Sequence, residues 1–140
     1  MNGGIGAVNP VNDKPRLKLS LLPDKFGICR LENSDGIPAW ALVGSFFSIT
    51  KTAEELSIVC PAAAVPVGTK GERGWRCLKV AGPLHFDQIG ILSALAQPLA
   101  QAGVSIFAVS TYDTDYLLVK GRDLARAVEA LQLAGHEVRA

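Results

Sequence analysis

Apolar residues in the second half of the chain recur with the periods of strands and helices in turn. Strands are predicted over residues 75–84 (WRCLKVAGPL), 104–110 (VSIFAVS), 115–119 (DYLLV) and 136–140 (HEVRA). Between them, apolar positions three or four residues apart predict helices over 86–103 and 123–135. The order strand, helix, strand, strand, helix, strand is that of ferredoxin-like folds, in which a four-stranded antiparallel sheet carries both helices on one face.

Both predicted helices have recognisable ends and one apolar face. The first is expected to begin at Asp87 as its N-cap, to be kinked by Pro98, which lacks a backbone N–H, and to stop at Gly103. The second is expected to stop at Gly135. The residues predicted to face the core are Ile91, Leu92, Leu95 and Leu99 in the first helix, and Leu124, Val128 and Leu131 in the second.

The first half contains a distant copy of the predicted hairpin of the second half. Residues 45–59 (SFFSITKTAEELSIV) align without a gap with residues 105–119 (SIFAVSTYDTDYLLV) at an offset of sixty, which brings Glu55 onto Asp115. We interpret this match as a duplicated unit. Strands at 16–22 and 26–32 predict a further hairpin across Pro23-Asp24, and the segment 37–44 (IPAWALVG) is short for a helix. The first unit is therefore expected to be degenerate.

The predicted organisation is an α+β protein made of two ferredoxin-like units packed together. The boundary is placed in the polar, glycine-rich stretch 67–74, so that residues 15–70 form the degenerate first unit and residues 71–140 the second. Residues 1–14, rich in Gly and Asn, are expected to be a flexible N-terminal tail. One unit alone would leave a sheet face or edge uncovered, and the second unit is expected to cover it.

Composition and charge argue against several classes of function. Fourteen basic and thirteen acidic side chains leave a net charge of +1 without a basic cluster, so nucleic acid is not expected as a partner. No apolar run approaches the roughly 20 residues of a membrane span, so no membrane association is expected. Cys29, Cys60 and Cys77 have no C-x-x-C spacing, so we expect buried thiols in a cytoplasmic protein, not a zinc site or a disulfide framework.

Two aspartates interrupt the apolar run 105–121. Asp113 is most simply a turn former. Asp115 begins a strand, where Asp is disfavoured, and either contacts the positive group of a ligand or has a purely structural role. A metal site or catalytic pair would need more ligands, and His85 and His136 lie in separate elements where they are expected to face solvent. No catalytic residue, metal or cofactor is therefore predicted.

The stretches 86–120 and 45–61 resemble the corresponding segments of small bacterial tandem ACT-domain proteins, and the same pair of modules occurs in the arginine-sensor protein of the TOR pathway. The most specific part of the resemblance is 109–119 (VSTYDTDYLLV), and the whole of it covers residues 17–138. It implies βαββαβ modules that bind amino acids or similar metabolites at an interface between modules. It also implies a regulatory role without catalysis.

The resemblance also implies a set of ligand-binding residues. The pocket is expected at the start of the first helix of the second unit, at the following hairpin turn and at a strand of a partner module. By motif these positions are Gly90 and Ser93, then Thr111, Tyr112 and Asp115, and finally Ser57 and Ile58. The arginine sensor has an acidic residue where this chain has Ser93, so arginine itself is not implied.

The expected function is that of a regulatory protein that binds a small molecule, an amino acid by preference, at one site per chain in a homodimer. The chemistry is consistent, because a helix N-terminus suits the carboxylate of a zwitterion and Asp115 suits its ammonium group. A structural or oligomerisation module without a ligand is the alternative. A small metabolic enzyme on the same fold ranks last, because no acid–base pair is evident.

Overall fold

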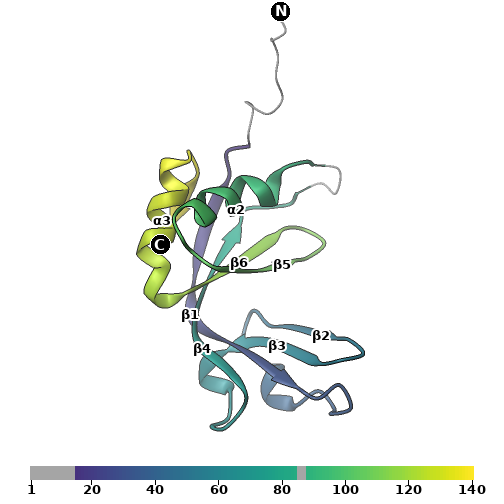
Figure 1. Cartoon of the computed structure of the whole chain (residues 1–140). Helices are drawn as coiled ribbons and strands as arrows, with labels where there is room; N and C mark the ends of the chain where they lie inside the picture. The colour runs from purple at the N-terminus through teal and green to yellow at the C-terminus, as the bar shows by residue number, and fades with distance from the viewer. Residues whose placement is uncertain (1–14, 85–87) are drawn as a thin grey trace, which may run out of the picture.

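The computed structural model describes residues 15–84 and 88–140 (Figure 1). Residues 1–14 and Asp87, predicted as a tail and a helix cap, and His85 lie outside the described residues. The elements are β1 (Lys18–Leu31), η2 (Ala39–Ala41), β2 (Ser48–Lys51), β3 (Leu56–Pro61), η3 (Ala62–Ala64), β4 (Gly71–Val80), α2 (Ile91–Gln101), β5 (Ile106–Ser110), β6 (Asp115–Lys120), η4 (Gly121–Asp123), α3 (Leu124–Leu133) and β7 (Glu137–Arg139). The element order predicted for the second half is confirmed.

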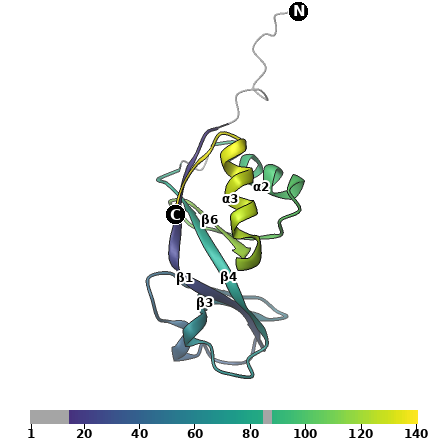
Figure 2. The same ribbon diagram turned by 90° about the vertical axis from the view of Figure 1, so that its left-hand side faces the viewer.

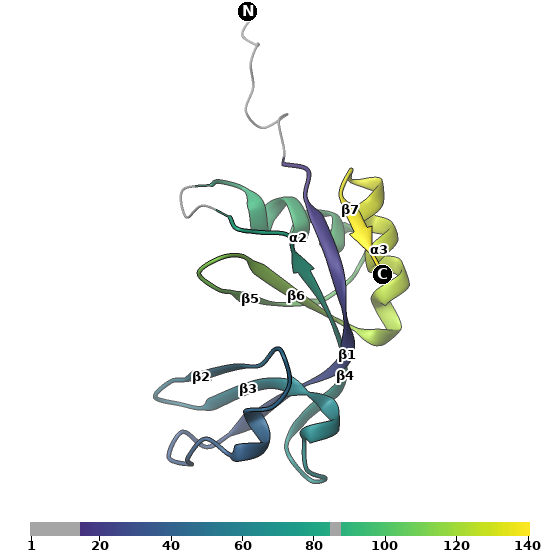
Figure 3. The ribbon, with the colours of Figure 1, turned by 180° about the vertical axis from the view of Figure 1, so that it is seen from behind.

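The seven strands of the described residues belong to one curled sheet with the order β2-β3-β1-β4-β6-β5, and β7 pairs with β1. The antiparallel strands β1 and β4 each run through both halves: residues 26–31 of β1 pair with β3, and residues 18–20 pair with β7. The hairpins β2–β3 and β5–β6 project to the same side of this long pair (Figure 3). The fold is a mixed α and β fold, but two separate packed units are not confirmed.

The pairing of β7 also differs from the predicted four-stranded sheet. In a ferredoxin-like unit the last strand lies beside the first, which would place β7 next to β4. Here the first part of β1 lies between them, antiparallel to β4 and parallel to β7. The sequence of the first half therefore completes the sheet of the second half.

The hairpin predicted across Pro23-Asp24 is wrong, because residues 18–31 form one continuous strand. The register against β4 shifts between Leu21 and Lys25, so that three residues of β1 face one of β4. Pro23 lies within this bulge, where a residue without an N–H costs no ladder hydrogen bond. The proline therefore bends the strand instead of ending it.

Helices α2 and α3 lie next to each other on one side of the sheet, beside the upper part of β1 and β4 (Figure 2). Their buried side chains are Ile91, Ala94, Leu95 and Leu99 from α2, and Ala127 and Leu131 from α3. Gly103 and Gly135 both have positive φ angles just after these helices, as predicted for the helix ends. Leu92, predicted to be in the core, is 40% exposed instead, and Leu124 and Val128 are only half-buried.

The two hairpins correspond in the structure at an offset of 59 residues instead of the predicted sixty. The turn between paired Lys51 and Leu56 corresponds to the turn between paired Ser110 and Asp115. In β3 and in β6 the third, fourth and fifth residues are buried, and each strand leads into a 3-10 turn. The counterpart of Asp115 is therefore Leu56, and the shared acidic position inferred from Glu55 is wrong.

The described part of the first half has no counterpart of α2 or α3, because its connections between strands are shorter. The β1–β2 connection, residues 32–47, is nine residues shorter than the β4–β5 connection, residues 81–105. The weak helix predicted at 37–44 is only the 3-10 turn η2. After β3, the chain reaches β4 through η3 without a counterpart of α3.

His136, predicted to face solvent, is buried with 5% exposure. Its ring lies between β1 and α2: Nδ1 accepts the backbone N–H of Leu17, and Nε2 bonds the carbonyl oxygen of Ala94, each over 3.1 Å. The three cysteines are buried and unpaired, as expected. Within residues 15–84 and 88–140, no helix is long and apolar enough to cross a membrane.

Candidate functional site

A cavity of about 590 Å³ lies where the β4–α2 connection, the first turn of α2 and the β5–β6 turn meet. These three segments are far apart in the chain but adjacent at one end of the helix layer. The residues that line the cavity are Leu84, Gln88, Ile89, Gly90, Ile91, Leu92, Ser93, Ser110, Thr111, Tyr112 and Asp115. Its volume falls in the range of small-molecule sites, about 300–1,000 Å³.

The β5–β6 turn is closed by its two threonines. Thr111 donates its backbone N–H and its hydroxyl to the Thr114 carbonyl oxygen over 2.8 and 3.0 Å, and its hydroxyl accepts the Thr114 N–H. The buried Thr114 hydroxyl donates to the carbonyl oxygen of Val80 over 2.7 Å. Asp113, predicted as the turn former, contributes its carbonyl oxygen, which accepts the Leu84 N–H over 2.6 Å. The turn is thus fixed to the end of β4.

Asp115 follows this turn as the first residue of β6, where it pairs with Ser110. Its side chain is half-buried in the cavity wall. Among the described residues it has no ion-pair or hydrogen-bond partner for its carboxylate. A fixed backbone therefore holds a carboxylate at the cavity, and no cation of the described residues neutralises it.

Gly90 precedes α2 with a φ of 82°, which is a left-handed conformation that favours glycine. The first backbone N–H groups of α2 have no acceptor within the helix. This end of the helix borders the cavity. The Ser93 hydroxyl donates to the Gly90 carbonyl oxygen over 3.4 Å. The glycine is thus needed for the backbone path of the cavity wall.

The structure brings five of the seven predicted ligand residues together. Gly90, Ser93, Thr111, Tyr112 and Asp115 all line this cavity.

The other two predicted residues lie elsewhere. Ser57 lines a separate groove of about 250 Å³ between the β2–β3 hairpin and β5, which meets the cavity at Ser110. Ile58 is completely buried in the core of the first half. Neither side chain reaches the cavity within this chain.

Sequence reasoning missed the aliphatic part of the site. Leu84, Ile89 and Leu92 line the cavity, and Ile89 is 93% exposed. Leu92 followed the helical period of the core positions, so periodicity alone assigned it to the core. Leu95 is buried in the core, whereas Leu92 lines the cavity because the β5–β6 turn lies beside the start of α2.

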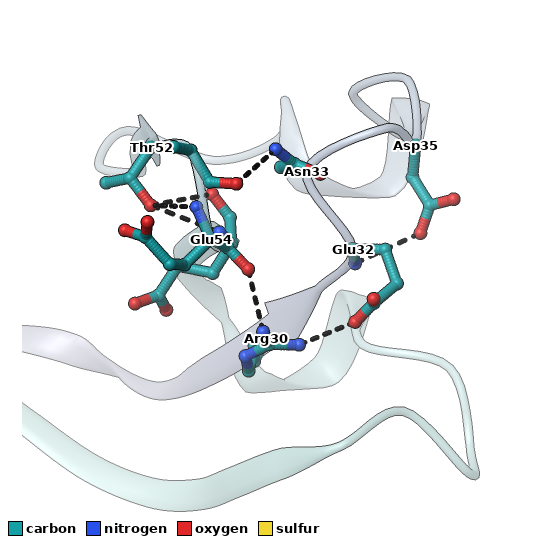
Figure 4. A network of polar contacts seen from close by, with 8 residues as sticks. Arg30, Glu32, Asn33, Asp35, Thr52 and Glu54 are labelled. Atoms are coloured by element: carbon teal, nitrogen blue, oxygen red, sulfur yellow. Dashed lines mark hydrogen bonds and ion pairs between the residues drawn. The ribbon is translucent and has the colours of Figure 1, made fainter.

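In the equivalent turn of the first half, side chains of β1 and of the following loop bond to the turn itself (Figure 4). Arg30 donates to the carbonyl oxygen of Glu54 over 2.8 Å, and Asn33 donates to that of Ala53 over 2.6 Å. Arg30 also pairs with Glu32 over 2.6 Å. This turn is therefore occupied by the chain's own cation and amide.

The described residues contain no group of three or more His, Cys, Asp or Glu side chains arranged to hold a metal ion. Asp113 and Glu54 occupy equivalent positions in the two turns, and both side chains are exposed. Each residue accepts a hydrogen bond through its backbone carbonyl oxygen.

Comparison with known proteins assigns the family. A model of the ACT domain matches residues 70–132, which include the whole cavity wall, and a model of an N-terminal domain matches residues 24–68. The human cytosolic arginine sensor for mTORC1 subunit 1 is 34% identical over 95 residues. The chain is an ACT-domain protein related to this arginine sensor.

The match to the arginine sensor covers 67% of this ACT-domain protein but only 28% of the human relative. A solved structure of a protein from Agobacterium tumefaciens is 46% identical, with a TM-score of 0.84, and the match covers 89% of this chain and 92% of that one. The ligand-free regulatory subunit of aspartate kinase from Thermus thermophilus has a TM-score of 0.59 at 11% identity, covering 83% of this chain and 96% of that one. This last likeness concerns the fold alone.

Proposed function

We propose that this ACT-domain protein is a regulatory protein that binds one amino acid per chain in the cavity between α2 and the β5–β6 turn. The observation that carries the proposal is the half-buried Asp115 carboxylate, held in the wall of a cavity without a partner among the described residues. Its role is to accept hydrogen bonds from the ligand's ammonium group, a charge-assisted contact that is stronger than a neutral one.

The start of α2 suits the carboxylate of a zwitterionic ligand. The first turn of α2 presents backbone N–H groups and the positive end of the helix dipole, both of which favour a carboxylate. Gly90 has no side chain, so a ligand approaches this backbone closely. The two ends of the site belong to different elements, so a ligand that bridges them favours the arrangement in which they are close.

One site per chain is proposed because the two turns differ. The first turn binds Arg30 and Asn33, whereas the second borders an open cavity. Ser57 contributes only if a second copy brings its groove to the cavity, so the proposal includes a homodimer with the site near its interface. The family relationship to an arginine sensor supports a sensing role and gives no support to a catalytic one.

The decisive experiment is thermal unfolding of the wild-type chain against each of the twenty amino acids. A ligand at a hundred times its dissociation constant adds about 2.7 kcal/mol, which raises Tm by several degrees. Asp115→Asn removes the charge that we assign to ligand binding. Asp113→Asn is the matched control, because Asp113 is an exposed carboxylate of the same turn that does not line the cavity.

The proposal expects one group of amino acids to raise Tm, and Asp115→Asn alone to abolish the rise. If no amino acid changes Tm at millimolar concentration, the chain is better described as a structural or oligomerisation module. An equal loss in both variants would show that general electrostatics, not Asp115, decides binding.

A further inference from the structure

The cavity has one polar side and one aliphatic side. Thr111, Ser110 and Asp115 form the polar side on the β5–β6 hairpin, while Leu84, Ile89, Ile91 and Leu92 line the side formed by the β4–α2 connection and the start of α2. Ile89 and Leu92 are 93% and 40% exposed. Large apolar side chains exposed together in one hollow indicate an apolar occupant.

We propose that the bound amino acid has an uncharged aliphatic side chain of three or four carbons, as in the leucine, isoleucine, valine and methionine class. This inference rests on the proposed function. The α-ammonium group bonds to Asp115, and the side chain lies against Leu84, Ile89 and Leu92. Each methylene that the ligand buries there increases affinity roughly fourfold, the factor that corresponds to the transfer of one CH₂ group out of water.

A cationic side chain fits this site poorly. Asp115 is the one acidic residue among the described residues that line the cavity, and the ligand's ammonium group already uses it. Ser93 and Thr111 offer neutral hydroxyl groups, and the Ser93 hydroxyl already donates to Gly90. A guanidinium group against the aliphatic side would lose water without gaining a carboxylate, which is unfavourable.

The exposed apolar residues also allow a protein partner in place of a ligand side chain. The placement of Leu84 and Ile91 argues for the ligand: they line the same hollow but are mostly covered, with Ile91 only 7% exposed. The aliphatic side thus continues inward from the rim, which a small ligand can enter and a flat protein surface cannot.

The test measures affinity by calorimetry for a homologous series: alanine, 2-aminobutyrate, norvaline and norleucine, with leucine, lysine and arginine alongside. We expect affinity to rise about fourfold for each added methylene, and leucine to bind at least tenfold more tightly than arginine. Leu92→Ser should weaken leucine binding about tenfold and leave alanine binding nearly unchanged. Leu133→Ser is the control, because Leu133 is an 83% exposed leucine at the end of α3 that does not line the cavity.

A second variant reverses the preference. Ile89 is almost fully exposed, so Ile89→Glu should fold normally and place a carboxylate at the rim of the aliphatic side. We expect it to weaken leucine binding and to increase the affinity for lysine or arginine at least fivefold. Sedimentation of both variants separates this effect from a change in oligomeric state.

The outcomes distinguish this inference from the proposed function. If arginine or lysine binds the wild-type chain as tightly as leucine, the aliphatic assignment is overturned while the amino-acid site stands. If Leu92→Ser changes the oligomeric state and not the leucine affinity, the aliphatic side is a protein interface and the inference fails. If no member of the series binds, both the inference and the proposed function are overturned.

Discussion

His136 Nε2 bonds the carbonyl oxygen of Ala94, which Pro98 leaves without its helical donor. In a regular α-helix this oxygen accepts the N–H of the residue four positions later, and Pro98 has none. On the other side of the ring, Nδ1 accepts the Leu17 N–H. Since a backbone N–H only donates, Nδ1 carries no proton, and the imidazole is the neutral tautomer with hydrogen on Nε2. One ring thus connects β1, α2 and the start of β7.

Replacing His136 with Ala should destabilise the protein by about 2–6 kcal/mol, because two buried backbone groups lose their partners at about 1–3 kcal/mol each. Urea unfolding measures the change. His136→Gln keeps a donor and an acceptor and should recover part of the loss. A loss below about 0.5 kcal/mol, the range of ordinary surface substitutions, would contradict the role of the ring.

A double-mutant cycle tests the link between His136 and Pro98. In Pro98→Ala the new backbone N–H reaches the Ala94 carbonyl oxygen, so His136→Ala should cost about 1 kcal/mol less in that background than in wild type. The free energies of unfolding of the four chains give the coupling. Additive effects, within about 0.3 kcal/mol, would show that the two residues do not share this oxygen.

Gly82→Ala should displace the turn that carries Asp115. A β-carbon at Gly82 would lie 2.9 Å from the Asp113 carbonyl oxygen and 3.1 Å from Thr114 Cβ. The crowding should cost about 1–3 kcal/mol of stability and weaken ligand binding, measured by unfolding and by calorimetry. Gly36→Ala is the control, because nothing lies within 4 Å of a β-carbon there. Unchanged binding in Gly82→Ala would separate the cavity from this contact.

Alkaline pH should destabilise the protein through Cys77. Burial raises the pKa of this thiol to about 12, whereas in the unfolded chain it ionises near pH 8.5. The folded state therefore keeps a proton that the unfolded state loses, and the free energy of unfolding should fall by about 1.4 kcal/mol per pH unit between about pH 8.5 and 12. Below about pH 8.5 this contribution is constant.

Cys77→Ala isolates the thiol from other alkaline titrations. Its urea-derived free energy of unfolding should fall less steeply than that of wild type between about pH 9 and 11, by about 1.4 kcal/mol per pH unit. Cys60→Ala provides a second comparison, since burial raises the pKa of Cys60 to about 11. Equal slopes in wild type and Cys77→Ala would contradict the assignment.

The sequence alone determined the local elements of the second half. Helical and strand periods predicted β4 to β7 with α2 and α3 in the right order, and the glycines after both helices marked their ends, because these signals depend on residues close in the chain. The family resemblance around Thr111 and Asp115 likewise predicted five of the residues that line the cavity, since one turn and one helix start supply them.

Only the tertiary structure decided how the first half is used. Pro23 signals a turn locally, but pairing with both β3 and β4 makes residues 18–31 one bent strand. His136 looked like a surface residue because its partners, Leu17 and Ala94, lie 119 and 42 residues away. Leu92 has the same spacing as Leu95, and only the arrangement around the cavity distinguishes them. Burial and pairing depend on contacts between distant segments, which periodicity along the chain does not contain.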